Sequence, residues 1–492
     1  MSSLKCTRKH LLTKYSPLAG GTHLPDITVI TPIFDKEGNT IIFYTASRGH
    51  HSEIGGILPG SMPASSTKLY EEGAQITSTF LVRDGVFFEE EISKILVADT
   101  AAYPGCSGTR KLADNLNDLK AQIAANYKGA TLVAALIEEC GIKTVHFYMN
   151  AIKQNAATAV KAYLKKTYEK FNGKPLHAID YMDDGTPIEL TITIDPEGTA
   201  KFDFEGTGLE GLHCYNAPSA ISKSATLYVL RCLINEPIPL NEGCLIPITF
   251  NIPYGTLLNP SGYAAVCAGN PITSQRVTDV LIKAFQACAA SQGDCNVFSF
   301  GYGGKDAETG EETSGFGFGE TICGGSGAGE GWHGTSGVHI HMTNTRITDP
   351  EVLEKRYPSI LNRFILRPGS EGVGLYNGGM GILREYEFRR PLSCSIVSER
   401  RVTRPFGMNG GGYAKSGRNS LVEKGKAGGE DRWVNIGGRK DFTVEAGDRV
   451  IIETPGGGGW GVPGKEKVTL EKGKPIEVEF TNEYQRRQEQ SN

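Results

Sequence analysis

The chain has 492 residues, of which 39% are hydrophobic and 22% charged, and its formal net charge is −4. This length can bury a large core, and this composition is typical of globular proteins. Because acids and bases are interspersed and no apolar stretch could span a bilayer, the sequence favours neither a nucleic-acid-binding nor a membrane protein. The first residues lack the apolar core of a secretory signal, so we expect a cytoplasmic location.

Eleven cysteines are scattered along the chain without a Cys-x-x-Cys pair. This spacing argues against a zinc ribbon or a redox dithiol, so we expect reduced, mostly buried thiols. Cys106, in a Pro-Gly-Cys-Ser-Gly loop, is interpreted as one of these and not as a nucleophile, because no base can be inferred beside it. The 62 glycines concentrate in the last third of the chain and predict close backbone approaches there.

The first half of the chain is predicted to hold short strands followed by long helices. Residues 29–31 and 41–44 are apolar runs separated by a turn at 35–39. From about 112 to 170, apolar residues recur at helical spacing. We expect the apolar stripe from Val145 to Leu164 to pack against a core.

The second half of the chain is predicted to be richer in strands. Apolar and polar residues alternate between 188 and 204 around the turn Asp195–Gly198, which predicts a β-hairpin. Residues 274–291 predict an amphipathic helix, and residues 392–401 and 448–454 predict strands between glycine turns.

The strand and helix blocks are segregated along the chain, which predicts an α+β fold. We expect one large mixed domain over residues 1–464, with a central helical block and a glycine-rich β C-terminal region. Residues 465–492 are charged and poor in aromatic residues, which is typical of a frayed tail.

Six of the ten histidines fall in two short segments, and the first of them contains His23, Asp26, His50 and His51. Two imidazoles and one carboxylate suit manganese, iron or zinc and leave coordination positions open. Adjacent residues of an extended segment point to opposite faces, so either His50 or His51 should reach a metal bound by His23 and Asp26. The alternative is a set of hydrogen-bonded structural histidines.

The second segment combines a glycine-rich loop, residues 324–331, with His339 and His341. No Gly-Lys-Ser/Thr follows the glycines, so the loop does not match a phosphate-binding P-loop, and close backbone packing is the favoured interpretation. On a strand, His339 and His341 would share one face and form either a ligand pair or a hydrogen-bonded cluster.

Several stretches resemble the hydantoinase B/oxoprolinase family. The resemblance runs from about Leu12 to Gly461 and is closest to the C-terminal part of eukaryotic ATP-dependent 5-oxoprolinases. The stretches that carry it are residues 19–26, 48–51, 59–63, 126–129, 216–218, 273–276 and 339–346.

The resemblance implies a hydrolase acting on cyclic amides. In this family a hydantoinase A part uses ATP and magnesium to phosphorylate the lactam oxygen, and the B part completes ring opening to glutamate. We therefore expect a lactam substrate, a hydantoinase A-type domain or subunit as partner, a role in glutathione metabolism and a homo-oligomeric assembly. A divalent metal (manganese, zinc or iron) is expected in the B part.

The resemblance also implies roles for individual residues. In the related acetone carboxylases, manganese is held by a His-x-x-Asp motif and a downstream histidine. The matching residues here are His23, Asp26 and, of the two neighbouring histidines, His50 as the assigned third ligand. Glu53 stands where the family usually has aspartate and is nominated as a base. Catalytic roles are assigned in addition to three further histidines of the two segments, His51, His339 and His341.

Two departures from the family leave other functions open. The chain lacks the hydantoinase A half and about the first hundred residues of a B domain, so we expect it to need another polypeptide. The alternatives are a subunit of another ATP-dependent hydantoinase, an acetone-carboxylase-like subunit, and a truncated non-catalytic paralogue.

Overall fold

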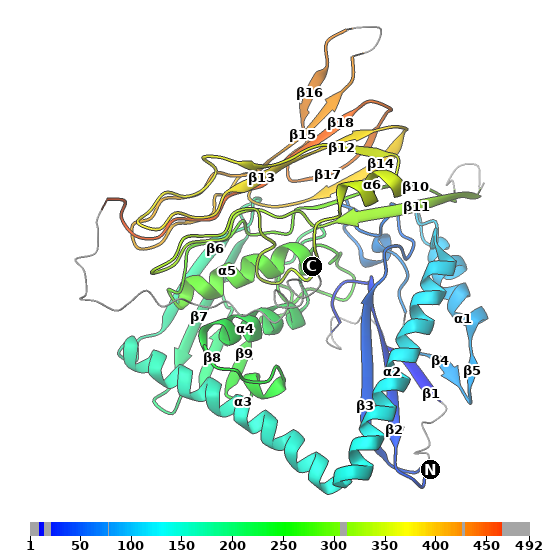
Figure 1. Ribbon diagram of the computed structural model, residues 1–492, viewed down its shortest axis with the longest axis vertical. Helices are drawn as coiled ribbons and strands as arrows, with labels where there is room; N and C mark the ends of the chain where they lie inside the picture. Colours follow the sequence, from blue (N-terminus) through cyan, green and yellow to red (C-terminus); the bar gives the residue numbers. More distant parts are fainter. Residues whose placement is uncertain (1–8, 14–20, 77, 306–311, 426–428, 465–492) are drawn as a thin grey trace, which may run out of the picture.

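Four sheets and two long helices build the molecule, which is known from a computed structural model (Figure 1). The structure describes residues 9–13, 21–76, 78–305, 312–425 and 429–464. It has the mixed α+β architecture expected from the sequence, with the helices in the middle and the glycine-rich strands at the C-terminal end. The predicted tail, residues 465–492, lies outside the described residues.

The N-terminal sheet has the strand order β3-β2-β1-β4-β5, with every neighbouring pair antiparallel. In β2, every second residue is buried, as expected of a strand that packs one face on a core. Among the described strands, β3 and β5 are at the two edges of this sheet. The strands are β1 Lys9–Thr13, β2 Asp26–Phe34, β3 Ile41–His50, β4 Thr79–Arg83 and β5 Val86–Phe87.

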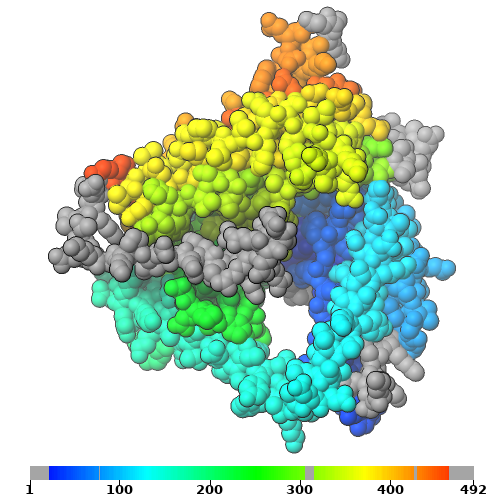
Figure 2. Space-filling model, viewed as in Figure 1, coloured from blue at the N-terminus to red at the C-terminus, as the bar shows by residue number. Residues whose placement is uncertain are grey.

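The central helical block consists mainly of α2 (Leu112–Cys140) and α3 (Ile142–Lys170), which follow α1 (Glu89–Lys94). Gly141 joins the long helices with a positive φ of 76°, which glycine adopts without strain. Helix α2 packs on β2 and β3. Figure 2 shows an opening bordered by the two long helices, the N-terminal sheet and residues of the next unit.

The apolar stripe of α3 packs only in part, which corrects the expectation. Val160 and Leu164 are fully buried, whereas Met149 and Ile152 are 47% and 44% exposed. The first half of α3 crosses from the end of α2 toward the next sheet (Figure 1), and Val145 in this half is buried.

The middle unit contains the predicted hairpin, β7–β8, in a four-stranded sheet of order β6-β7-β8-β9. Helices α4 and α5 pack against each other, and α5 also packs on β6 and β7. The largest apolar core lies here. The elements are β6 Leu176–Tyr181, β7 Pro187–Ile194, β8 Ala200–Asp203, β9 Ile248–Asn251, α4 Ser219–Leu233 and α5 Ser274–Ala284.

Helix α5 is shorter than the predicted 274–291 because other backbone segments compete for the groups that follow. Gln286 adopts φ 52°, which ends the helical path. The amide of Ala289 then donates to the carbonyl of Ala328, and that of Ala290 donates to Phe406, at 2.8 and 3.0 Å. Helical periodicity in sequence cannot reveal such tertiary partners.

The C-terminal region holds two sheets, of order β11-β10-β14-β17 and β12-β13-β18-β15-β16, with the short helix α6 (Pro350–Arg356). The predicted strands 392–401 and 448–454 appear as β14 and β18. The strands are β10 Val297–Lys305, β11 Glu312–Glu320, β12 Ser359–Arg367, β13 Gly381–Phe388, β14 Leu392–Val397, β15 Arg418–Glu423, β16 Arg432–Asn435, β17 Arg439–Val444 and β18 Arg449–Glu453.

The glycine-rich loop at 324–331 packs backbone against backbone, as favoured from the sequence. A Cβ added to Gly327 would lie 1.9 Å from the carbonyl oxygen of Ala289, and one added to Gly325 would lie 2.1 Å from that of Gly379. Only glycine permits such approaches. Within the described part of the chain, none of the helices is both long and apolar enough for a membrane crossing.

Candidate functional site

His23, Asp26 and His50 are brought together at one end of the β2–β3 pair. Asp26 begins β2 and His50 ends β3, and the two residues are direct partners in the antiparallel register, so their side chains share a face. His23 Nδ1 lies 3.3 Å from Asp26 Oδ2, and the rings of His23 and His50 have centroids 5.0 Å apart. The turn before β2 holds this arrangement, since the amide of Asp26 donates to the carbonyl of His23.

The ionisation of Asp26 and His50 suits cation binding. Burial opposes ionisation of Asp26, but the hydrogen bond and charge of His23 outweigh it and hold the pKa of Asp26 well below its usual range. The surrounding protein desolvates the His50 imidazole, although part of the residue reaches solvent. This desolvation, as the larger cause, and the charge of His23, as the second, lower the pKa of His50 to about 4. At neutral pH the carboxylate is ionised and the His50 imidazole is neutral, which are the forms that ligate metals.

The residues present fit a divalent metal in kind. His23 is 5% exposed, and its buried Nδ1 lies 3.3 Å from Asp26 Oδ2, which holds the imidazole beside the carboxylate. Imidazole nitrogen and carboxylate oxygen suit manganese, zinc or iron. Within the described ranges, no three His, Cys, Asp or Glu side chains stand close enough to form a closed metal-binding group. Metal ligation by His23, Asp26 and His50 therefore stays a prediction.

His51 points away from this group and toward α2. Its ring is buried, with Nδ1 3.1 Å from Asn115 Nδ2 and Nε2 3.4 Å from Gln122 Oε1. Burial lowers the pKa of His51, so the ring is neutral at pH 7. Of the two adjacent histidines, the structure thus brings His50 and not His51 to His23.

Glu53 is fully buried, and its carboxylate organises the loop that follows β3. Oε1 accepts from the amide of Gly55 at 2.6 Å and Oε2 from that of Gly60 at 2.8 Å. Arg110 Nη1 lies 3.1 Å from Oε1. These contacts occupy both carboxylate oxygens, and the assignment of Glu53 as a base stays a prediction.

His339 and His341 do not lie on a strand and do not share a face, which corrects the expected arrangement. His341 adopts φ 38°, and its Nδ1 lies 3.2 Å from the hydroxyl of Tyr228 on α4. Its Nε2 lies 3.6 Å from Asp279 on α5. Both ring nitrogens of His339 are buried without a partner, and burial lowers the pKa of His339. The catalytic roles assigned to the two residues stay predictions.

Two residues beside Asp26 were not among those chosen from the sequence. Thr22 Oγ1 and Asn270 Nδ2 each donate to Asp26 Oδ2 at 3.0 Å. Thr22 lies within the motif that resembles the family, so its position was available as a signal. Asn270 is 244 residues from Asp26 and lies three residues before the motif Thr273–Arg276, whose proximity to Asp26 only the fold establishes.

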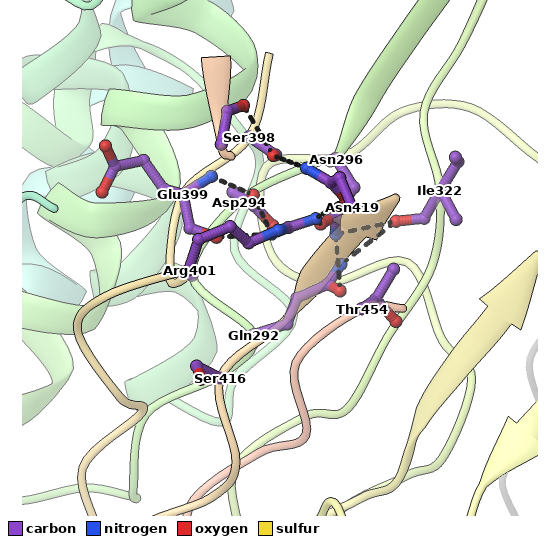
Figure 3. Close-up of polar contacts among 12 residues, drawn as sticks. Gln292, Asp294, Asn296, Ile322, Ser398, Glu399, Arg401, Ser416, Asn419 and Thr454 are labelled. Atoms are coloured by element: carbon purple, nitrogen blue, oxygen red, sulfur yellow. Dashed lines mark hydrogen bonds and ion pairs between the residues drawn. The ribbon is translucent and has the colours of Figure 1, made fainter. Parts of the chain in front are cut away.

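A second polar cluster is buried between the middle unit and the C-terminal sheets (Figure 3). Arg401 Nη2 donates to the side-chain oxygens of Asn296 and Asn419 at 2.7 and 3.0 Å. Asp294 accepts from the amide of Glu399, and burial raises the pKa of Asp294 to about 7. Because these groups bind one another, the cluster joins segments that are distant in the sequence.

The chain belongs to the hydantoinase B/oxoprolinase family, whose model matches residues 11–463. It is 50% identical to 5-oxoprolinase 1 of Arabidopsis thaliana over 464 residues, and 50% identical to the 5-oxoprolinase of Saccharomyces cerevisiae over 459. Each match covers 92% of this chain and 35% of the relative. An uncharacterized protein of Schizosaccharomyces pombe is 55% identical, over 95% of this chain and 36% of its own length. The chain thus spans about a third of these relatives.

Two solved structures share the fold. The ATP-dependent caprolactamase of Pseudomonas jessenii superimposes with a TM-score of 0.77 at 22% identity, over 93% of this chain and 78% of that one. A nucleotide-free acetone carboxylase gives 0.73 at 18% identity, over 92% and 65% of the two chains.

Proposed function

We propose that this chain is the ring-opening part of a 5-oxoprolinase, which converts 5-oxo-L-proline, ATP and water to L-glutamate, ADP and phosphate. The observation that carries the proposal is the meeting of His23, Asp26 and His50 at one end of the β2–β3 pair, in a chain half identical to two 5-oxoprolinases. A hydantoinase A-type part would supply the ATP-dependent step, with magnesium.

The chemistry assigned to this chain begins with a lactam whose oxygen carries a phosphoryl group. Water adds to the ring carbon, the carbon–nitrogen bond breaks with its electron pair going to nitrogen, and nitrogen takes up a proton. Hydrolysis with a second water then releases the phosphate. A divalent metal held by His23, Asp26 and His50 would polarise the reacting centre or acidify a water.

The chain's own groups prepare the site for this reaction. Thr22 and Asn270 fix the orientation of Asp26 through its Oδ2. His51 holds the end of β3 against α2 through Asn115 and Gln122. Such supporting hydrogen bonds keep reactive groups in place and are required for efficient catalysis.

The product, L-glutamate, would connect the reaction to glutathione metabolism, and we propose that it takes place in the cytoplasm. The described cysteines are all free thiols, which agrees with a reducing compartment. We propose, too, that the active assembly contains several copies of this chain with the A-type part.

The test is glutamate formation from 5-oxo-L-proline and ATP by the purified chain together with a hydantoinase A-type part. His23→Ala and Asp26→Ala should each lower kcat by at least about a hundredfold, since they remove groups that position or activate the reacting atoms. His177→Ala is the matched control, because His177 is 53% exposed on β6. Activity that persists in the His23 and Asp26 variants would contradict the proposed site.

Substrate trials in the same assay decide between related functions. Turnover of caprolactam or a hydantoin with no glutamate formed from 5-oxo-L-proline would assign another cyclic amide. Carboxylation of acetone would assign the acetone-carboxylase type. A folded chain that binds the A-type part but turns over none of these substrates would fit a non-catalytic paralogue.

A further inference from the structure

One buried polar atom beside Asp26, Oδ1 of Asn270, has no hydrogen-bond partner among the described residues. Native structures leave few buried polar groups without a hydrogen-bond partner, ligand, ion or water. His23 and Asn270 both contact the same carboxylate, at 3.3 Å and 3.0 Å from Asp26 Oδ2. Oδ1 of Asn270 is thus a free acceptor next to two of the proposed metal ligands.

The fold fixes Asn270 in this position through the backbone. Asn270 lies in a π-helical turn, Gly269–Thr273, directly before α5, and such turns occur frequently at functional sites. Gly269 allows the turn to pack closely, since an added Cβ would lie 2.6 Å from the carbonyl oxygen of Asn216. The amide of Ala268 also donates to Cys214 at 2.9 Å. Asn270 is therefore held by a packed segment.

We propose that Asn270 supplies, through Oδ1, a fourth protein ligand to the metal of His23, Asp26 and His50. The inference rests on the metal site of the proposed function and deepens it. A side-chain amide oxygen is a hard donor that suits a divalent cation such as Mn²⁺. Nδ2 donates to Asp26 and so fixes the amide plane, which leaves Oδ1 as the free acceptor.

A ligand from Asn270 would make the site depend on two distant parts of the chain. His23, Asp26 and His50 belong to the N-terminal sheet, whereas Asn270 leads into α5 of the middle unit. Binding of the cation would then stabilise the contact between these units, because a ligand that binds only the assembled state raises its stability. Mn²⁺ alone should raise the Tm of the chain.

The experiment measures Mn²⁺ affinity of the full chain by titration calorimetry and by the electron paramagnetic resonance of free Mn²⁺. Asn270→Leu removes both the oxygen and the N–H donors of the side-chain amide, whereas Asn270→Asp keeps an oxygen and loses the donors. Thr22→Val is the matched control, since Thr22 makes the other 3.0 Å hydrogen bond to Asp26 Oδ2. Circular dichroism shows that each variant is folded.

We expect Asn270→Leu to weaken Mn²⁺ binding by at least about a hundredfold and Thr22→Val by about tenfold or less, as for the loss of a group that only orients a ligand. Asn270→Asp should stay within about tenfold of wild type, because its carboxylate can replace the amide oxygen.

Three results would overturn the inference. Equal weakening by Asn270→Leu and Thr22→Val would mean that Asn270 only orients Asp26. Loss of binding in Asn270→Asp as large as in Asn270→Leu would mean that the N–H group matters and not the oxygen. A wild-type chain that binds no Mn²⁺ would remove the site itself. None of these measurements depends on ring opening, so a failed glutamate assay is distinguished from a failed ligand assignment.

Discussion

Glu72 is fully buried, and only one of its carboxyl oxygens is hydrogen-bonded. Oε1 accepts from the amides of Val266 and Cys267 at 2.8 and 2.9 Å and from Ser66, whereas Oε2 has no partner. Burial raises the pKa of Glu72 to about 8 and outweighs these hydrogen bonds, which favour the ionised form. Glu72 thus keeps its proton at neutral pH, while its Oε1 fixes the segment that leads to Asn270.

This raised pKa predicts a loss of stability with rising pH. The unfolded chain releases the Glu72 proton near pH 4.5 and the folded chain near pH 8, so the folded state binds more protons in between. The free energy of unfolding therefore falls as the pH rises through this window. Glu72→Gln keeps the accepting oxygen without an ionisable proton, and we expect it to raise Tm more at pH 8 than at pH 5. The control is Glu197→Gln, in an exposed turn; equal shifts of the two variants at both pH values would contradict the prediction.

At the scale of single residues, the sequence identifies part of the site. The His-x-x-Asp motif and the histidine pair place His23, Asp26 and His50 together once β2 and β3 pair, because side chains alternate along a strand. Asn270 and Glu72 could not be found in this way. Their roles depend on a contact between the N-terminal segment and residues 266–270. No local sequence pattern in either segment indicates that the two segments meet.

At the scale of elements, α2 is attached to the N-terminal sheet by buried amide side chains as well as by its apolar face. Gln122 Nε2 donates to the carbonyl of Ile27 at 2.9 Å and to that of Ser47 at 3.2 Å. Asn126 Nδ2 donates to the carbonyl of Val29 at 2.9 Å. The helix thus supplies hydrogen bonds to carbonyl groups of β2 and β3, and it holds the strands that carry the candidate site.

Replacing Gln122 by leucine should loosen this attachment. The two carbonyl groups would lose a buried donor, and we expect the free energy of unfolding to fall by about 1–3 kcal/mol. Thermal unfolding followed by circular dichroism measures the change as a lower Tm. Gln154→Leu makes the same replacement at an exposed position of α3 and should leave Tm nearly unchanged. If the two variants unfold at the same temperature, the polar attachment is not important.

Helices and the central hairpin were predictable because their signals are local. The helical periodicity at 112–170 corresponds to α2 and α3, and the alternation at 188–204 corresponds to β7–β8. Helix α5 ends earlier than its periodicity indicates, since Ala289 and Ala290 pair with the backbones of Ala328 and Phe406. Periodicity also could not show that Met149 and Ile152 of the α3 stripe remain exposed, because that depends on what lies opposite.

At the scale of the whole molecule, the order of strands in four sheets was beyond prediction, and buried charges help to fix it. Arg400 is fully buried, and its Nη2 lies 2.7 Å from Asp180 of β6 and 3.3 Å from Asp279 of α5. Arg400 follows β14, so these ion pairs join a C-terminal sheet to the middle unit. Two consecutive charged residues, Glu399 and Arg400, are buried in this way, although a charged run normally indicates a surface.

Removal of the Arg400 charge should therefore weaken the contact between the C-terminal sheets and the middle unit. Arg400→Met removes the arginine partner of the buried Asp279 and leaves Asp180 with Arg276 alone, and breaking a buried pair in this way costs about 3–5 kcal/mol. We expect a clearly lower Tm, measured by scanning calorimetry, in which a chain of this size can show more than one transition. Adding Asp279→Asn should restore part of the loss, because it removes one uncompensated charge. Arg432→Met is the control, since Arg432 is 74% exposed beside Glu423 and such pairs contribute about 0–1 kcal/mol. If Arg400→Met behaves like this control, the buried cluster is not what joins the two parts of the molecule.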